Sequence, residues 1–219
     1  MVLDSKIKAV IFDMDGVISD TQSLMSRVES EFLREHDVNL SPEEITKRYA
    51  GTTSGEMLTN AFSLFKKPIE NLDSLIQERR ERIDRAVVGN IVEVPGTRLF
   101  IQNLKAKNMP TAVASASRVS FIELVLQSLG LREYFDAIAS SDEVPRGKPE
   151  PDVFLLAAQR LGVSPDACLV IEDGAHGMVA ARRAGMSSIG LVRRGELDKS
   201  VYPADFLVRS LEDVQLDPL

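Results

Sequence analysis

Short apolar runs alternate with stretches of helical periodicity over most of this chain, and this alternation limits the folds open to it. The apolar runs cover residues 7–12, 111–114, 135–139, 168–171, 188–192 and 205–208. Few polar residues interrupt these runs, which is typical of strands buried on both faces of a parallel sheet. Helical stretches cover residues 97–108, 119–129, 151–161 and 176–184, each followed closely by a glycine or a proline. Together they predict an α/β fold with a doubly wound parallel sheet.

One region breaks the alternation, between the first and the second predicted strand. From Thr21 to about Val88 the sequence has helical periodicity only. Two apolar faces recur there, Leu24, Val28 and Phe32 on one and Leu72, Ile76, Ile83 and Val87 on the other. We therefore predict a core domain over residues 1–18 and 92–219 and an inserted helical domain over 19–91, joined by two connections that could act as hinges.

Charge and cysteine count narrow the possible partners. A formal net charge of -7 argues against nucleic acid or an anionic membrane surface as a partner. Because Cys168 is the only cysteine, neither an intramolecular disulfide nor a cysteine-based metal motif can form. The apolar run at residues 9–12 is too short for a signal peptide or a membrane span. We expect a cytoplasmic protein that binds neither nucleic acid nor a membrane.

Polar and charged residues follow four of the predicted strands, at the sheet edge where open α/β proteins bind ligands. These segments are Asp13-Met14-Asp15-Gly16, Ser115-Ala116-Ser117-Arg118, the loop with Lys148 at residues 146–152, and Glu172-Asp173-Gly174. Taken singly, each has an ordinary interpretation: the acidic pairs as capped turns, the hydroxyls as helix N-caps, and the lysine as a solvated charge. A helix start after the second strand would also offer backbone N–H groups to a phosphate.

The combination of the four segments points to a metal. In this topology the four loops converge on one edge of the sheet and bring four carboxylates together with a hydroxyl and one ammonium group. Clustered carboxylates repel one another strongly unless cations lie among them. Mg²⁺ binds typically through a few carboxylates plus substrate phosphate. The sequence therefore predicts Mg²⁺ as the cofactor at this edge.

These segments resemble the motifs of a known family. Asp13 to Val17, the strand end at Ser115, Lys148-Pro149, and Glu172-Asp173 with Gly177 and Ala184-Gly185-Met186 are similar to the four motifs of the haloacid dehalogenase superfamily. The helical insertion matches the cap domain that this family places between its first and second motifs. The resemblance spans nearly the whole chain and is greatest to the branch that contains β-phosphoglucomutase and phosphoglycolate phosphatase. It implies a Rossmann-like core.

The resemblance also implies roles for individual residues. Asp13 would be the nucleophile and Asp15 the acid/base, while Ser115 and Lys148 would bind the transferring phosphoryl group. The Mg²⁺ ligands would be Asp13, the backbone carbonyl of Asp15, and Asp173, with Glu172 assisting. The implied activity is hydrolysis of a small phosphorylated metabolite, a phosphate monoester such as a sugar phosphate, through an aspartyl-phosphate intermediate. With a cap to shield the site, a monomer suffices.

Substrate recognition is expected at two places. The first is Thr52, Thr53 and Ser54 in the insertion, although Thr53 or Ser54 could equally serve as the N-cap of the next helix. The second is Ser117 and Arg118, at the helix start after the second strand.

Two alternatives to a phosphatase remain open. In the β-phosphoglucomutases a histidine follows the acid/base aspartate by ten residues and an arginine follows the cap-loop glycine by three; here Met25 and Ser54 stand there. Neither side chain can orient the acid/base carboxylate or clamp a second phosphate, so we favour hydrolysis. A non-catalytic phosphoacceptor domain would share the acidic pairs, but it would carry no large helical insertion and would not require Asp15.

Overall fold

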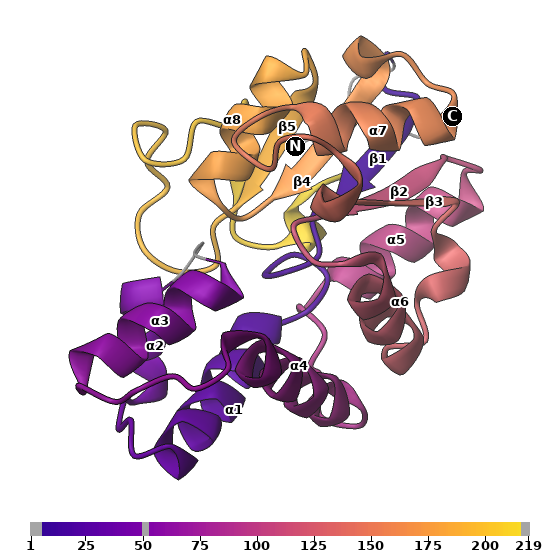
Figure 1. Cartoon of the computed structure of the whole chain (residues 1–219). Coiled ribbons are helices and arrows are strands. Elements are labelled where there is room, and N and C mark those ends of the chain that lie inside the picture. The colour runs from indigo at the N-terminus through magenta and orange to yellow at the C-terminus, as the bar shows by residue number, and fades with distance from the viewer. Residues whose placement is uncertain (1–5, 50–52, 216–219) are drawn as a thin grey trace. The chain divides into compact units, whose positions relative to one another are not determined.

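The computed structural model describes residues 6–49 and 53–215, and its centre is a parallel β-sheet (Figure 1). The strands are β1 (Ala9–Phe12), β2 (Thr111–Ser115), β3 (Ala137–Ser140), β4 (Cys168–Glu172), β5 (Ser187–Leu191) and β6 (Phe206–Val208). Every neighbouring pair in the order β3-β2-β1-β4-β5-β6 is parallel. Each strand overlaps one of the six predicted runs, so the predicted α/β class and parallel sheet are confirmed.

The strand order has a reversal between β1 and β4. The chain builds outward from β1 through β2 to β3, then returns to β4 on the other side of β1 and builds outward again. At the carboxyl end of the sheet Phe12 pairs with Val113 on one side and with Ile171 on the other. A doubly wound sheet binds its ligands at such a reversal. The segments that follow β1 and β4 therefore lie where chemistry is expected.

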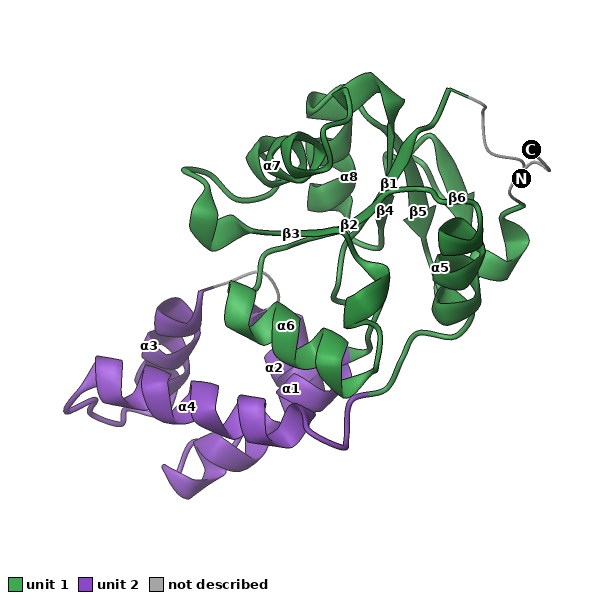
Figure 2. Ribbon diagram, turned by 90° about the vertical axis from the view of Figure 1, so that its right-hand side faces the viewer, with its two compact units in different colours: residues 1–20, 92–219 green, residues 21–91 purple. Residues whose placement is uncertain are grey.

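Helices cover both faces of this sheet (Figure 2). They are α5 (Thr97–Ala106), α6 (Val119–Ser128), α7 (Asp152–Leu161) and α8 (Ala175–Arg183). In Figure 2, α7 and α8 lie over one face, and α5 and α6 lie over the other. Glycine ends α7 as predicted: Gly162 has a φ of 66°, a left-handed conformation that costs glycine little.

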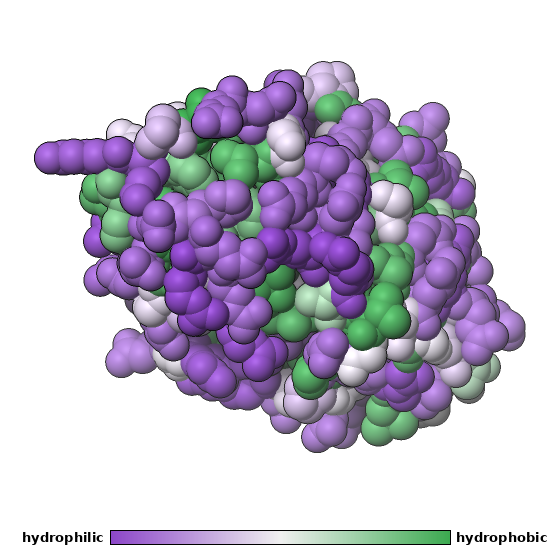
Figure 3. Space-filling view, turned by 60° about the horizontal axis from the view of Figure 1, so that its bottom comes forward, coloured by the Kyte–Doolittle hydropathy of each residue, from purple (hydrophilic) through white to green (hydrophobic). Residues whose placement is uncertain are grey.

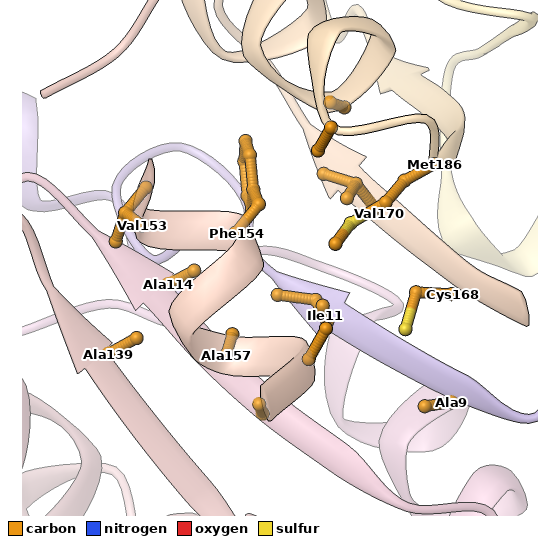
Figure 4. Close-up of a cluster of buried hydrophobic side chains, with 14 of the residues drawn as sticks. Ala9, Ile11, Ala114, Ala139, Val153, Phe154, Ala157, Cys168, Val170 and Met186 are labelled. Carbon is orange, nitrogen blue, oxygen red and sulfur yellow. The ribbon is translucent and has the colours of Figure 1, made fainter. Parts of the chain in front are cut away.

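Small side chains allow α7 to approach the strands closely. In Figure 4, Val153, Phe154 and Ala157 of α7 lie over the strands, near Ala114 of β2 and Ile11 of β1. On the opposite face Phe12 packs edge-to-face with Phe100 and Phe135, with ring centroids 6.1 and 5.7 Å apart. Because Ile11 and Phe12 are both fully buried on opposite faces, β1 is apolar without alternation. This packing on both faces explains why the apolar run at residues 7–12 correctly predicted a buried strand.

The chain divides into two compact units: unit 1 is Met1–Asp20 with Val92–Leu219, and unit 2 is Thr21–Ile91. Ser19 and Asp20, assigned from the sequence to the insertion, belong to unit 1. Ser19 forms an antiparallel bridge with Glu93, and the amide of Asp20 donates to the carbonyl of Val92 at 2.8 Å. The two connections thus pair with each other where they leave unit 1.

Unit 2 is helical in its described residues, as the periodicity predicted. Its helices are α1 (Thr21–Glu35), α2 (Pro42–Tyr49), α3 (Ser54–Leu64) and α4 (Leu72–Val87). Their core includes Phe32, Leu33, Leu58 and Phe62. The expected apolar faces are only partly buried: Leu24 and Phe32 are buried but Val28 is half-exposed, and polar Glu29 of α1 is buried instead.

The exposed surface is mostly polar. On the face in Figure 3, hydrophobic residues form separate patches between hydrophilic ones. Within residues 6–49 and 53–215, no helix combines the length and the apolar character needed to span a membrane.

Candidate active site

The segment after β1 turns sharply while it keeps Asp13 at the sheet. The amide of Asp13 donates to the carbonyl of Ile171 at 2.9 Å, which continues the pairing of β1 with β4. The carbonyl of Met14 then accepts the amides of Ile18 and Ser19, at 2.9 and 3.0 Å, and closes the turn. Gly16 has a φ of 81°, and a Cβ there would overlap the carboxylate of Asp173. Glycine is therefore required for both the turn and the approach of Asp173.

Lys148 lies at the centre of the carboxylates. Its Nζ donates to Asp13 Oδ1 at 2.5 Å, to Glu172 Oε2 at 2.8 Å and to the carbonyl of Ala114 at 3.2 Å. An ammonium group has three donors, so all three are used. The side chain is 11% exposed and Nζ lies 4.8 Å from the centre of the Phe154 ring. The interpretation of Lys148 as a solvated charge is therefore wrong.

Asp15 lies beside the hydroxyl groups that follow β2. The Oγ atoms of Ser115 and Ser117 each donate to Asp15 Oδ2 at 3.5 Å. Ser115 Oγ accepts the amide of Ser117 at 3.1 Å, and Ser140 Oγ at the end of β3 donates to the Ser117 carbonyl at 2.8 Å. These bonds fix the loop after β2 against Asp15 and the end of β3.

Arg118 behaves differently from its neighbours. It is the N-cap residue of α6, and its Nε donates to Ser120 Oγ at 3.0 Å. Its guanidinium group lies over the ring of Phe121, 5.5 Å from the ring centre. The side chain therefore lies along its own helix. Only the position of Arg118 at the start of α6 still favours the predicted role in phosphate binding.

Three carboxylates are close enough to share a cation. Asp13, Glu172 and Asp173 each offer an oxygen atom, and these atoms lie within 4.8 Å of one another. Glu172 is anchored by its Oε1, which accepts the amide of Gly174 at 3.0 Å. A Cβ at Gly177 would overlap the same carboxylate, so this glycine makes room for Glu172.

The electrostatics of this cluster fit a divalent cation. Burial, and then the charge of Glu172, raises the pKa of Asp13 well above its ordinary value. Burial and the charges of Glu172 and Asp15 raise the pKa of Asp173 to about 7. Burial alone would lower the pKa of Lys148, but the carboxylates of Asp13 and Glu172 raise it above its ordinary value. One ammonium group thus faces an excess of carboxylates, and hard oxygen ligands of this kind suit Mg²⁺.

The expected recognition residues of the insertion have structural partners within unit 2. Thr53 is the N-cap of α3: its Oγ1 accepts the amide of Glu56 at 3.2 Å, and its own amide donates to Glu56 Oε2 at 2.9 Å. Ser54 Oγ accepts a hydrogen bond from Arg79 Nη1 at 2.8 Å. Thr52 lies outside the described residues. Arg79 was missed in the sequence, although a charge between Ile76 and Ile83 on an apolar helix face was a signal for it.

Comparison with known proteins identifies the class. Residues 7–185 match the haloacid dehalogenase-like hydrolase family. Hexitol phosphatase B of Escherichia coli K12 is 33% identical over 190 residues, covering 84% of this chain and 83% of that protein. Beta-phosphoglucomutase of Bacillus subtilis is 31% identical over 219 residues, covering 97% of this chain and 94% of that protein.

A solved crystal structure is also similar to this chain in fold. The crystal structure of CbbY from Rhodobacter sphaeroides, in complex with xylulose-(1,5)bisphosphate, superposes with a TM-score of 0.81 at 27% identity and covers 96% of this chain and 97% of that one. The chain therefore belongs to the haloacid dehalogenase-like hydrolase family and is an enzyme. The predicted resemblance, including that to β-phosphoglucomutase, is confirmed.

Proposed function

We propose that this chain is a Mg²⁺-dependent phosphatase that hydrolyses small phosphate monoesters, such as sugar phosphates, through an aspartyl-phosphate on Asp13. The observation that carries the proposal is the cluster around Lys148, which holds Asp13 and Glu172 together at the reversal point of the sheet. Asp15 lies on the same edge with two serine hydroxyls. In this proposal Asp13 is the nucleophile, Asp15 is the proton donor and the ammonium group of Lys148 is the cation, and all three act on one phosphoryl group.

Asp13, Glu172 and Asp173 would hold the ion, together with the backbone carbonyl of Asp15. When bound, Mg²⁺ supplies positive charge that lowers the repulsion between a carboxylate nucleophile and a dianionic phosphate ester.

In the first step a carboxylate oxygen of Asp13 forms a bond to phosphorus and the bond from phosphorus to the ester oxygen breaks. The leaving alkoxide takes a proton from the carboxyl group of Asp15, so the alcohol departs neutral. Lys148 stays protonated because Asp13 and Glu172 raise its pKa, and it keeps the nucleophile oriented through the bond to Oδ1. The hydroxyls of Ser115 and Ser117, which lie 3.5 Å from Asp15 Oδ2, would donate to phosphoryl oxygens of the bound ester.

In the second step Asp15, now a carboxylate, takes a proton from water as the water oxygen attacks phosphorus. The bond between phosphorus and Asp13 breaks, and inorganic phosphate leaves. Asp13 is again a carboxylate and Asp15 is again protonated, so the cycle closes.

A mutase remains the second candidate because the chain is 31% identical to β-phosphoglucomutase of Bacillus subtilis over 97% of its length. Two residues favour the phosphatase. Met25 offers only a thioether where the mutases carry a histidine, and the hydroxyl of Ser54 is engaged by Arg79. The named activity of hexitol phosphatase B supports a sugar phosphate or sugar-alcohol phosphate as the substrate class.

The test is a Mg²⁺-dependent assay on a panel of small phosphate esters that includes hexitol phosphates and β-glucose 1-phosphate. Release of inorganic phosphate and formation of glucose 6-phosphate are both followed. Phosphate release that is lost in Asp13→Asn supports the phosphatase. Glucose 6-phosphate without phosphate release would identify a mutase, and turnover by Asp13→Asn comparable with the parent protein would exclude Asp13 as the nucleophile.

A further inference from the structure

Ser140, at the end of β3, is fully buried and is not used by the proposed mechanism. Its Oγ donates to the carbonyl of Ser117 at 2.8 Å, at the edge of the sheet where β2 and β3 end. Ser115 and Ser140 are the last paired residues of these two strands. The loop after β2 is therefore still held by β3 beyond the last strand pairing, through a side chain and not through a backbone amide.

Capping of a short helix accounts for part of what this hydroxyl does. Ser140 Oγ accepts the amide of Asp142 at 3.1 Å, and Glu143 Oε2 accepts the amide of Ser140 at 3.0 Å. These two bonds form a capping box for the 3-10 helix Ser141–Glu143. An oxygen that only capped this helix would need no donated bond of its own, so the bond to Ser117 serves another purpose.

A second capped helix in the same unit shows the difference. Ser210 caps the 3-10 helix Leu211–Asp213, and its Oγ accepts the amide of Glu212 at 3.2 Å. Within the part of the chain that the structure describes, Ser210 Oγ donates no hydrogen bond. The capping role is thus complete at Ser210 without a donated bond, whereas Ser140 also uses its proton to reach the loop after β2.

The donated bond completes the restraint of Ser117. The amide of Ser117 donates to Ser115 Oγ at 3.1 Å, so both its amide and its carbonyl are held by serine hydroxyls. With its backbone held in this way, the hydroxyl of Ser117 lies 3.5 Å from Asp15 Oδ2. A hydroxyl that must meet a phosphoryl oxygen needs a fixed backbone, because a displacement of about 1 Å can cost about 100-fold in rate.

We propose that Ser140 is a positioning residue whose bond to the Ser117 carbonyl holds the hydroxyls of Ser115 and Ser117 where they bind phosphoryl oxygens in the transition state. The part that concerns catalysis rests on the proposed function. Ser140 does not contact the substrate in this proposal, because its hydroxyl is buried and already engaged by Ser117 and Asp142.

Two substitutions remove the donor. Ser140→Ala deletes the hydroxyl, and Ser140→Cys fills the same space with a thiol, which is a weak donor. In each variant kcat for a hexitol phosphate, sorbitol 6-phosphate, should fall about tenfold while KM changes by less than about twofold, because the transition state loses more than the ground state. Full kcat in Ser140→Cys would mean that volume and not the donated bond matters, and it would overturn the proposal.

Two controls separate positioning from stability. Ser210→Ala removes a capping hydroxyl of the same kind that donates no bond among the described residues. Thr111→Val removes a fully buried hydroxyl that donates to the carbonyl of Tyr134 at 2.6 Å, at the opposite end of β2. Each bond lost should lower Tm by about 2–4 °C, but kcat in both controls should stay within about twofold of the parent protein. An equal loss of kcat in either control would show that lower stability alone reduces turnover, and it would overturn the positioning role.

Amide hydrogen exchange at Ser117 reports on the loop without any turnover. Its amide donates to Ser115 Oγ, and this bond should open about tenfold more often in Ser140→Ala and Ser140→Cys but not in the two controls. Unchanged exchange would overturn the positioning of the loop, and faster exchange with unchanged kcat would overturn its part in catalysis. If the parent protein released no phosphate from any ester, the proposed function would fail, yet the exchange result would still decide whether Ser140 holds the loop.

Discussion

The ammonium group of Lys148 directs its three donors at Asp13, Glu172 and the carbonyl of Ala114. Lys148→Met keeps the length of the side chain but leaves two buried carboxylates without their cation. We expect turnover to fall by about 10³-fold and the free energy of unfolding to fall by about 3–5 kcal/mol, as when one partner of a buried ion pair is removed. Phosphate release and urea unfolding measure the two effects.

Lys105→Met is the control for that experiment. Lys105 pairs with Asp136 at 3.0 Å, but both side chains are 44% exposed. Solvent screens such a pair, so its loss should cost less than about 1 kcal/mol and leave turnover unchanged. Equal losses of unfolding free energy in Lys148→Met and Lys105→Met would show that burial of the Lys148 ion pairs does not add to their effect on stability.

The free energy of unfolding should depend on pH through Asp173. Burial and the charges of Glu172 and Asp15 raise the pKa of Asp173 from 3.8 to about 7 in the metal-free protein. Between these values the folded protein binds more protons than the unfolded chain, so the free energy of unfolding should fall as pH rises. Urea unfolding in EDTA at several pH values measures this slope, and Asp173→Asn should make it shallower. If Asp173→Asn left the pH dependence of the free energy of unfolding unchanged, Asp173 would not be the group responsible for it.

At the scale of elements, helix α8 approaches β4 closely because Gly177 has no side chain. A Cβ there would overlap the buried carboxylate of Glu172. Gly177→Ala should therefore displace Glu172 from Lys148, destabilise the protein by about 1–3 kcal/mol and reduce turnover, which thermal unfolding and phosphate release would measure. Gly55→Ala in α3 is the control, because its Cβ would meet only Ile76 Cδ1 at 3.7 Å and alanine favours a helix. Similar destabilisation by both substitutions would argue against the overlap.

The sequence was sufficient to predict the strands of the sheet, because two-sided burial leaves a continuous apolar run that needs no tertiary information to recognise. The ends were less certain. Polar Ser115 and Glu172 extend β2 and β4 by one residue, and apolar Ile7 lies outside β1. Strand ends depend on pairing with neighbours, which hydrophobicity does not encode.

The contacts of the candidate site were predictable only in part. Strand-end position brings Asp13, Lys148 and Glu172 to one edge, but the sharing of one ammonium group between two carboxylates depends on side-chain geometry. The pair of Glu29 and Arg79 was missed because the residues lie 50 positions apart. Its signal was present on both helices: Glu29 lies three residues before buried Phe32, and Arg79 lies four before buried Ile83. Opposite charges at core-facing positions of two helices suggest a buried pair.

At the scale of the whole molecule, the proposed metal site links catalysis to folding. Its three carboxylates come from the end of β4 and from the residues that directly follow β1 and β4, and these two strands are distant in sequence and meet only in the folded sheet. Mg²⁺ should therefore bind the folded protein much more tightly than the unfolded chain. The repulsion that raises the pKa of Asp173 should also be relieved, so the stabilisation by Mg²⁺ should increase as pH rises through about 7.

This coupling between Mg²⁺ binding and folding should raise the thermal stability of the protein. At a Mg²⁺ concentration of about 100 times its Kd the folded state should gain about 2.7 kcal/mol, which raises Tm by roughly 5–10 °C for a chain of this size. EDTA should abolish turnover and the gain in Tm together, and Mg²⁺ should restore both. Ca²⁺ should restore Tm better than turnover, because it prefers a looser and higher coordination. Asp173→Asn should show neither response, whereas turnover in EDTA, or an unchanged gain in Tm for Asp173→Asn, would mean that these carboxylates hold no catalytic metal.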